Sequence, residues 1–107
     1  MSDKTEKFTA FGTIPDAYQS ELLTIAGEEC NEVAVRISKM QRFGIDEVEP
    51  GQLNTNAARL SMEIGNLQCM IDELVDEGLV DREWVSIGYH EKADKLPRFM
   101  RNTKVRS

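Results

Sequence analysis

Two long stretches of the chain carry apolar residues at the three- and four-residue spacing of a helix, and this pattern limits the possible folds most strongly. The first stretch follows Pro15 and Asp16, a pair typical of helix starts, and runs to about Arg42, before Gly44. Its apolar face comprises Leu22, Ile25, Ala26, Cys30, Val33, Ala34, Ile37 and Met40. No segment has a convincing strand pattern, so the sequence predicts an all-α protein.

A second helix is expected to begin near residues 54–56, where Asn and Thr side chains can cap it, and to continue to about Glu77. Its apolar face comprises Leu60, Ile64, Leu67, Ile71, Leu74 and Val75. A third helix is expected from Asp81 towards Lys95, with Pro97 interrupting it or restarting a short final piece. The fold expected from these segments is a compact bundle of three to five helices.

With 107 residues the chain is expected to form one domain, over residues 16–100. An N-terminal arm (1–15) would precede it and a flexible basic tail (101–107) would follow it. A domain of this size buries limited surface, so we expect a homo-oligomer, with dimerisation completing the core.

Charge and hydropathy exclude several classes of partner. The net charge of −6 argues against binding to nucleic acid polymers or anionic membranes. No apolar run approaches the roughly 20 residues that span a bilayer, and the first residues lack a secretory signal pattern. The two cysteines, Cys30 and Cys69, do not require a disulfide, so we expect a cytoplasmic protein with reduced thiols.

Acidic side chains fall within the apolar faces of both long helices. On the first helix, Glu29 lies inside the face and Glu32 lies at its border, one turn along. On the second helix, Glu63 lies inside the margin and Asn66 follows three residues later. Burial of an unpaired carboxylate costs several kcal/mol unless it is protonated or binds a metal. Three acids and an amide between two helices suggest a magnesium site for phosphate chemistry.

A simpler interpretation is that these acids are rim residues, or that they pair with a nearby base such as Arg36 or Arg59. A single glutamate near an apolar face is usually explained in this way. The same three-residue pattern on two helices favours a shared site instead.

The acids also form two ordered motifs. Glu28-Glu29-Cys30-Asn31-Glu32 has the pattern E-E-x-x-E, and Glu63-Ile64-Gly65-Asn66 stands where E-x-x-D would be expected. With the Asn56, Arg59 and Leu60 lead-in and a basic segment at residues 92–99, the chain resembles the MazG-like all-alpha nucleoside triphosphate pyrophosphohydrolase superfamily, in particular its small phage and bacterial members. The resemblance covers about residues 17–100. It departs from the family pattern at Asn66, and in the 30 residues between Glu32 and Glu63.

The resemblance implies hydrolysis of an NTP or dNTP to the monophosphate and pyrophosphate, with Mg²⁺ as the cofactor and Mn²⁺ as an alternative. It implies these roles: metal binding by Glu29, Glu32, Glu63 and Asn66; orientation of the attacking water by Glu28 or Glu29; and phosphate binding by Lys92, Lys95 and Arg98. It also implies a dimer or tetramer, in the host cytoplasm if the protein is phage-encoded. Trp84 or Tyr89 could stack on the base, although either could instead complete the core.

Two other functions stay open. Asn66 favours a catalytically degenerate helical module that binds a nucleotide or a partner protein, whereas the intact E-E-x-x-E motif favours an enzyme. A third possibility is a helical dimerisation adaptor without a ligand, in which the inward acids pair with arginines across an interface.

Overall fold

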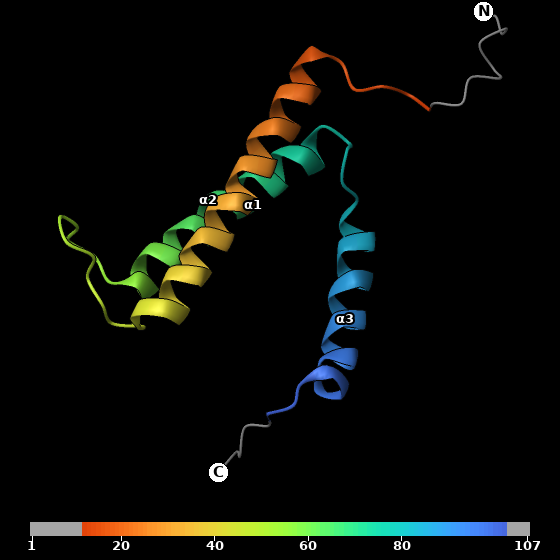
Figure 1. Cartoon of the computed structure of the whole chain (residues 1–107). Coiled ribbons are helices and arrows are strands. Elements are labelled where there is room, and N and C mark those ends of the chain that lie inside the picture. The colour runs from red at the N-terminus through yellow and green to blue at the C-terminus, as the bar shows by residue number, and fades with distance from the viewer. Residues whose placement is uncertain (1–11, 103–107) are drawn as a thin grey trace, which may run out of the picture.

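The computed structural model describes residues 12–102, and over this range the chain forms three helices and no strand (Figure 1). Helix α1 spans Ala17–Phe43, α2 spans Asn56–Asp76 and α3 spans Arg82–Phe99. The prediction of an all-α chain is confirmed. Residues 1–11 of the expected arm and residues 103–107 of the expected tail lie outside the described residues.

Side chains at the helix starts satisfy backbone amides that have no partner within the helix. The Asp16 carboxylate accepts a hydrogen bond from the Gln19 amide at 2.8 Å, and the Gln19 side chain accepts one from the Asp16 amide at 3.0 Å. Thr55 accepts from the Ala58 amide at 3.1 Å and caps α2 in the same way. The helix starts therefore lie within a residue or two of those that the sequence predicts.

Helix α3 begins after its capping residue, Asp81, and continues through Pro97 to Phe99. The expectation that Pro97 would interrupt this helix is therefore wrong. Pro97 lies in the last turn, where its fixed φ is compatible with a helix and its missing amide removes a single hydrogen bond. The Met100 amide still donates to the Leu96 carbonyl at 3.2 Å and closes that turn.

Helices α1 and α2 form an antiparallel pair, and the apolar core occupies one end of it (Figure 1). Leu22, Ala26 and Leu74 are buried there, near the start of α1 and the end of α2. Partly buried side chains that pack against them are Met70, Leu79 and Val80. Towards the loop that joins the two helices, the buried residues are polar: Arg36 and Asn56. The interface therefore has an apolar end and a polar end.

The surface of α1 that α2 covers is centred differently from the predicted apolar face. Cys30, Ala34 and Ile37 were expected in that face, but all three are exposed, Ile37 to 44%. The contact instead runs through Glu29 and Arg36, which lie 80° or more around the helix from Ile37 at about 100° per residue. An apolar stripe of α1 is thus left uncovered.

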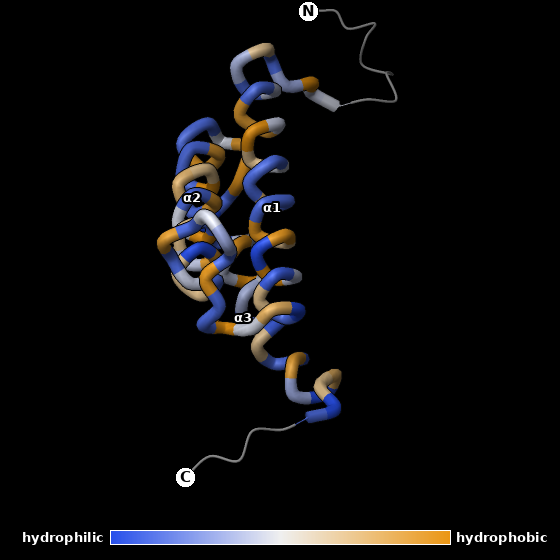
Figure 2. The backbone as a smooth tube through the Cα atoms, turned by 60° about the vertical axis from the view of Figure 1, so that its left-hand side comes forward, coloured by the Kyte–Doolittle hydropathy of each residue, from blue (hydrophilic) through white to orange (hydrophobic). Residues whose placement is uncertain are grey.

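Helix α3 leads away from the pair (Figure 1), contains no buried residue, and carries both hydrophobic and hydrophilic residues along its length (Figure 2). Trp84 and Tyr89 are each 71% exposed, so neither completes a core within the chain. Both cysteines are also free and exposed. Within one chain the packed unit is thus the α1–α2 pair, and the expected compact bundle does not include α3. No helix among residues 12–102 is long and apolar enough to cross a membrane.

The loop between α1 and α2 is held by a buried asparagine at the start of α2. The Asn56 side chain is 1% exposed, and its Nδ2 donates to the Gly44 carbonyl at 2.8 Å and to Glu47 Oε1 at 3.0 Å. Gly44 has φ 108°, a conformation that favours glycine, at the end of α1. These contacts fix the ends of the loop that joins α1 and α2.

Glu49 ties the same loop to both helices. Its Oε1 accepts from Lys39 of α1 at 3.3 Å and from Arg59 of α2 at 3.2 Å. The hydrogen bond from Lys39, followed by that from Arg59, lowers the pKa of Glu49. The pairing therefore stabilises the fold at neutral pH, and this contribution is lost as the pH falls through the lowered pKa.

We predict that Asn56→Ala lowers the free energy of unfolding by about 1–3 kcal/mol, because the Gly44 carbonyl and Glu47 lose their donor in a buried site. Urea denaturation would measure the change. The control is Asn31→Ala, an exposed position of α1, which should alter stability by no more than about 0.5 kcal/mol. Equal stability of the two variants would contradict the role given to Asn56.

Candidate functional site

Glu29 of α1 and Glu63 of α2 meet in the interface, beyond the apolar core. Both are half-buried, and Glu29 Oε1 is buried without a hydrogen-bond partner in the described part of the chain. The pKa of Glu29 is raised, first by desolvation and then by a hydrogen bond with Glu63 and by its charge. The two motif glutamates are therefore close enough to interact directly, as the helical pattern predicts.

The exposed neighbours of Glu29 add to the negative charge. Glu32 and Glu28 both raise the pKa of Glu29 further through their charges. Neither forms a hydrogen bond or an ion pair within residues 12–102. The charges of Glu28 and Glu32 thus act on Glu29, but neither residue is hydrogen-bonded to Glu29 or Glu63 in the described part of the chain.

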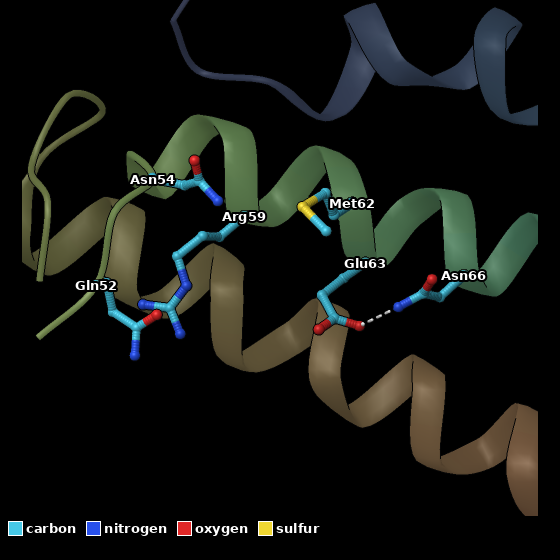
Figure 3. Close-up of a pocket in the computed structure, with 6 residues that line it drawn as sticks. All are labelled: Gln52, Asn54, Arg59, Met62, Glu63 and Asn66. Atoms are coloured by element: carbon cyan, nitrogen blue, oxygen red, sulfur yellow. Dashed lines mark hydrogen bonds between the residues drawn. The ribbon is translucent and has the colours of Figure 1, made fainter.

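Asn66 holds the carboxylate of Glu63. Its Nδ2 donates to Glu63 Oε1 at 3.2 Å, along the same face of α2 (Figure 3). This contact uses the amide nitrogen and leaves the amide oxygen available as a ligand. An aspartate at this position could not donate to a charged Glu63 and would instead repel it.

A shallow pocket adjoins this carboxylate. It has a volume of about 190 Å³ and is lined by Gln52 and Asn54 of the loop and by Arg59, Met62, Glu63 and Asn66 of α2 (Figure 3). Typical ligand pockets occupy about 300–1,000 Å³. The pocket is therefore smaller than a typical ligand pocket.

The donor set at the centre fits a hard divalent cation in part. It offers two opposed carboxylates and an amide, all with oxygen ligands of the kind that Mg²⁺ prefers, and one carboxylate oxygen lacks a donor. Among residues 12–102, however, no three His, Cys, Asp or Glu side chains are arranged so that they could hold a metal ion together. The four-residue ligand set that includes Glu32 stays a prediction.

The predicted phosphate-binding residues lie elsewhere. Lys92, Lys95 and Arg98 are exposed on α3, and Arg98 pairs with Asp94 at 3.3 Å. Because α3 leads away from the α1–α2 pair, the structure does not bring these residues to Glu29 and Glu63 within one chain (Figure 1).

Arg59 was considered in the sequence as a partner for an inward acid and as part of the lead-in to the second motif, but not as a residue of the site. It lies one turn before Glu63 and lines the same pocket, but it pairs with Glu49 rather than with Glu29. Its four-residue spacing from Glu63 was the signal that could have identified it as part of the site.

Comparisons with protein-family models, with curated proteins and with solved structures found no match to this chain. The resemblance to the MazG-like superfamily therefore depends on the two motifs themselves.

The raised pKa of Glu29 predicts how stability depends on pH. Below the ordinary pKa of 4.5, Glu29 is protonated in both the native and the unfolded state, and the native state carries no buried charge. As the pH rises through the raised pKa of the native state, the native protein must hold a charged, desolvated carboxylate, and its free energy of unfolding falls. We expect Glu29→Gln to be more stable than the parent protein at pH 7.5, with the difference disappearing below about pH 4.5. Metal-free samples unfolded in urea at the two pH values would show this.

Glu28→Gln is the matched control, because Glu28 is exposed on the same turn. If Glu29→Gln and Glu28→Gln change the pH dependence of the free energy of unfolding equally, the burial of Glu29 does not cause the effect.

Proposed function

We propose that this protein hydrolyses nucleoside triphosphates, NTP or dNTP, to the monophosphate and pyrophosphate with Mg²⁺ or Mn²⁺ as cofactor. The observation that carries the proposal is the approach of Glu29 to Glu63, because these residues belong to the two separate acidic motifs. Two like charges brought together in a partly desolvated interface are stabilised by a cation. The activity is proposed to occur in the cytoplasm, of the host if the protein is phage-encoded.

Glu29 and Glu63 would hold the metal ion, with the amide oxygen of Asn66 and the carboxylate of Glu32 as further ligands. When bound, Mg²⁺ neutralises phosphate charge and polarises the phosphoryl group. Glu28 or Glu29 would orient the water that attacks phosphorus, by accepting a hydrogen bond from it. Of these two residues, Glu29 lies in the interface beside Glu63, whereas Glu28 is exposed.

Asn66 supports a second candidate function, a nucleotide- or protein-binding module without turnover. With Asn66 in place of an acid, the site carries one negative charge fewer than the E-x-x-D pattern. This lowers its attraction for a divalent cation, while the hydrogen bond to Glu63 keeps the local structure intact. Catalysis is the primary proposal because the E-E-x-x-E motif is complete.

We also propose that a second copy of the chain completes the fold and the site, as a dimer or tetramer. Helix α3 is wholly exposed, α1 keeps an uncovered apolar stripe, and the pocket is small for a nucleotide. Lys92, Lys95 and Arg98 would then serve the carboxylates of a partner protomer, because they lie away from those of their own chain.

Pyrophosphate release from a panel of NTPs and dNTPs is expected only with Mg²⁺ or Mn²⁺. Glu29→Gln and Glu32→Gln should each reduce turnover by about a hundredfold or more while the helical circular dichroism is retained. Asn66→Asp should raise Mg²⁺ affinity, since it restores a negative charge. No release by the folded parent protein, together with nucleotide binding, would favour the binding module.

The oligomer is tested by sedimentation. We expect a mass of at least about twice 12.1 kDa for the parent protein. Leu96→Glu, which places a charge at an apolar position of α3, should shift it towards the monomer, whereas His90→Glu, about 120° around the helix from Leu96, should not. A monomeric parent protein at high concentration would exclude the shared site.

A further inference from the structure

Arg36 is a buried cation that the proposed mechanism does not use. It lies in the α1–α2 interface, its relative exposure is 9%, and its Nη1 is buried without a hydrogen-bond partner. It forms no ion pair within residues 12–102, so it does not neutralise Glu29 as the sequence allowed. A guanidinium removed from water without a counter-charge is strongly unfavourable, so its position needs an acceptor.

Two further cations lie at the same end of the interface as Arg36, and both are paired. One turn further along α1, Lys39 shares the carboxylate of Glu49 with Arg59 of α2. The loop carries two further acids, Asp46 and Glu47, and Glu47 accepts from Asn56. Of the three cations at this end of the interface, Lys39 and Arg59 are paired with Glu49, whereas Arg36 forms no ion pair in the described part of the chain and is the one that lacks an anionic partner.

Arg36 also lies in line with the carboxylate pair. It follows Glu29 by seven residues, which is two helical turns, about 10 Å along the axis and about 20° around it. Glu29 and Arg36 thus lie on one stripe of α1, and each has a buried polar atom that lacks a hydrogen-bond partner in the described part of the chain. They could contact the two ends of one ligand, with a metal-bound phosphate at Glu29 and a free phosphate tail at Arg36.

We propose that Arg36 binds the phosphate tail of the substrate and the pyrophosphate that leaves. The planar fork of N–H donors in arginine matches phosphate oxygens, and its hydrogen bonds to a charged acceptor are strong. Because Arg36 is already packed between two helices, little side-chain entropy is lost when an anion binds. The identity of the ligand rests on the proposed function, whereas the binding of an anion by Arg36 does not.

Binding of inorganic pyrophosphate to the full chain tests this proposal, with calorimetry and thermal shift in metal-free buffer. Arg36→Met keeps the length of the side chain and removes its charge. We expect it to weaken pyrophosphate binding about 10- to 100-fold and to leave the melting temperature without ligand unchanged or higher. Arg36→Lys should bind with intermediate affinity, since it keeps the charge and loses the fork.

Two controls separate this site from others. Arg42→Met removes an exposed arginine of the same helix and should bind pyrophosphate like the parent protein. Glu29→Gln alters the metal end and should retain metal-free pyrophosphate binding. The proposal is overturned if the parent protein binds no pyrophosphate, or if Arg36→Met and Arg42→Met bind it equally.

The remaining outcomes distinguish the two proposals. Pyrophosphate binding that requires Arg36, without NTP hydrolysis, would support the anion site and contradict the enzyme. NTP hydrolysis by Arg36→Met with an unchanged KM and an unchanged pyrophosphate affinity would support the enzyme and contradict the anion site. A loss of oligomer in Arg36→Met, with its pyrophosphate affinity unchanged, would show that Arg36 pairs with a carboxylate of a second copy and would also overturn the anion site.

Discussion

The packing of α1 against α2 is the contact on which the rest of the structure depends. Its apolar end, at Leu22, Ala26 and Leu74, supplies the hydrophobic stabilisation, and its polar end is held by the loop. Asn56 and Glu49 fix that loop to both helices, so that the register between them is set at two places. Glu29 and Glu63 lie between the apolar core at one end of the interface and the loop contacts at the other. Their approach is therefore imposed by contacts outside the site, which is how two like charges can be kept close together in the metal-free protein.

Periodicity and capping residues were sufficient to predict the helices and to place Glu29 inside the first interface. They were insufficient wherever the outcome depended on a partner element. A helical wheel gives the angle of Ile37 on α1, but it does not show how much of the surface of α1 is covered by α2. The predicted bounds of α3 likewise do not specify its tertiary contacts. Glu63 and Asn66 could be predicted beside Glu29 from the apolar faces of two adjacent helices, whereas the sequence did not show that the α3 cations lie away from these residues within one chain. Arg36 was considered only as a partner for the acids, since a sequence does not show which polar side chains are left unpaired.

The charges in the interface are separated rather than neutralised, and helix geometry explains this. Glu29 and Arg36 are two turns apart on a rigid helix, so they cannot pair with each other. Glu49 shows the opposite arrangement: it sits on a loop, reaches both Lys39 and Arg59, and has a lowered pKa. The charged groups of the loop are thus paired, whereas Glu29, Arg36 and the neutral Asn56 each keep one buried polar atom without a hydrogen-bond partner in the described part of the chain. Unpaired groups of this kind disfavour the free protein and favour a complex that supplies both a cation and an anion.

Asn66 can be understood in the same terms. With Glu29, Glu63 and the charge of Glu32 already close, a further acid on α2 would increase the repulsion that raises the pKa of Glu29. The amide instead donates to Glu63 and fixes the orientation of that carboxylate. The same substitution reduces the attraction for a divalent ion, so the stability of the metal-free protein and the affinity for metal change in opposite directions at this residue. A site with fewer acids depends more on the substrate to complete the coordination of the ion, because phosphate oxygens can supply the missing charge. In the proposed mechanism the metal and the nucleotide would then bind cooperatively, with the phosphate tail held by Arg36 at the polar end of the interface.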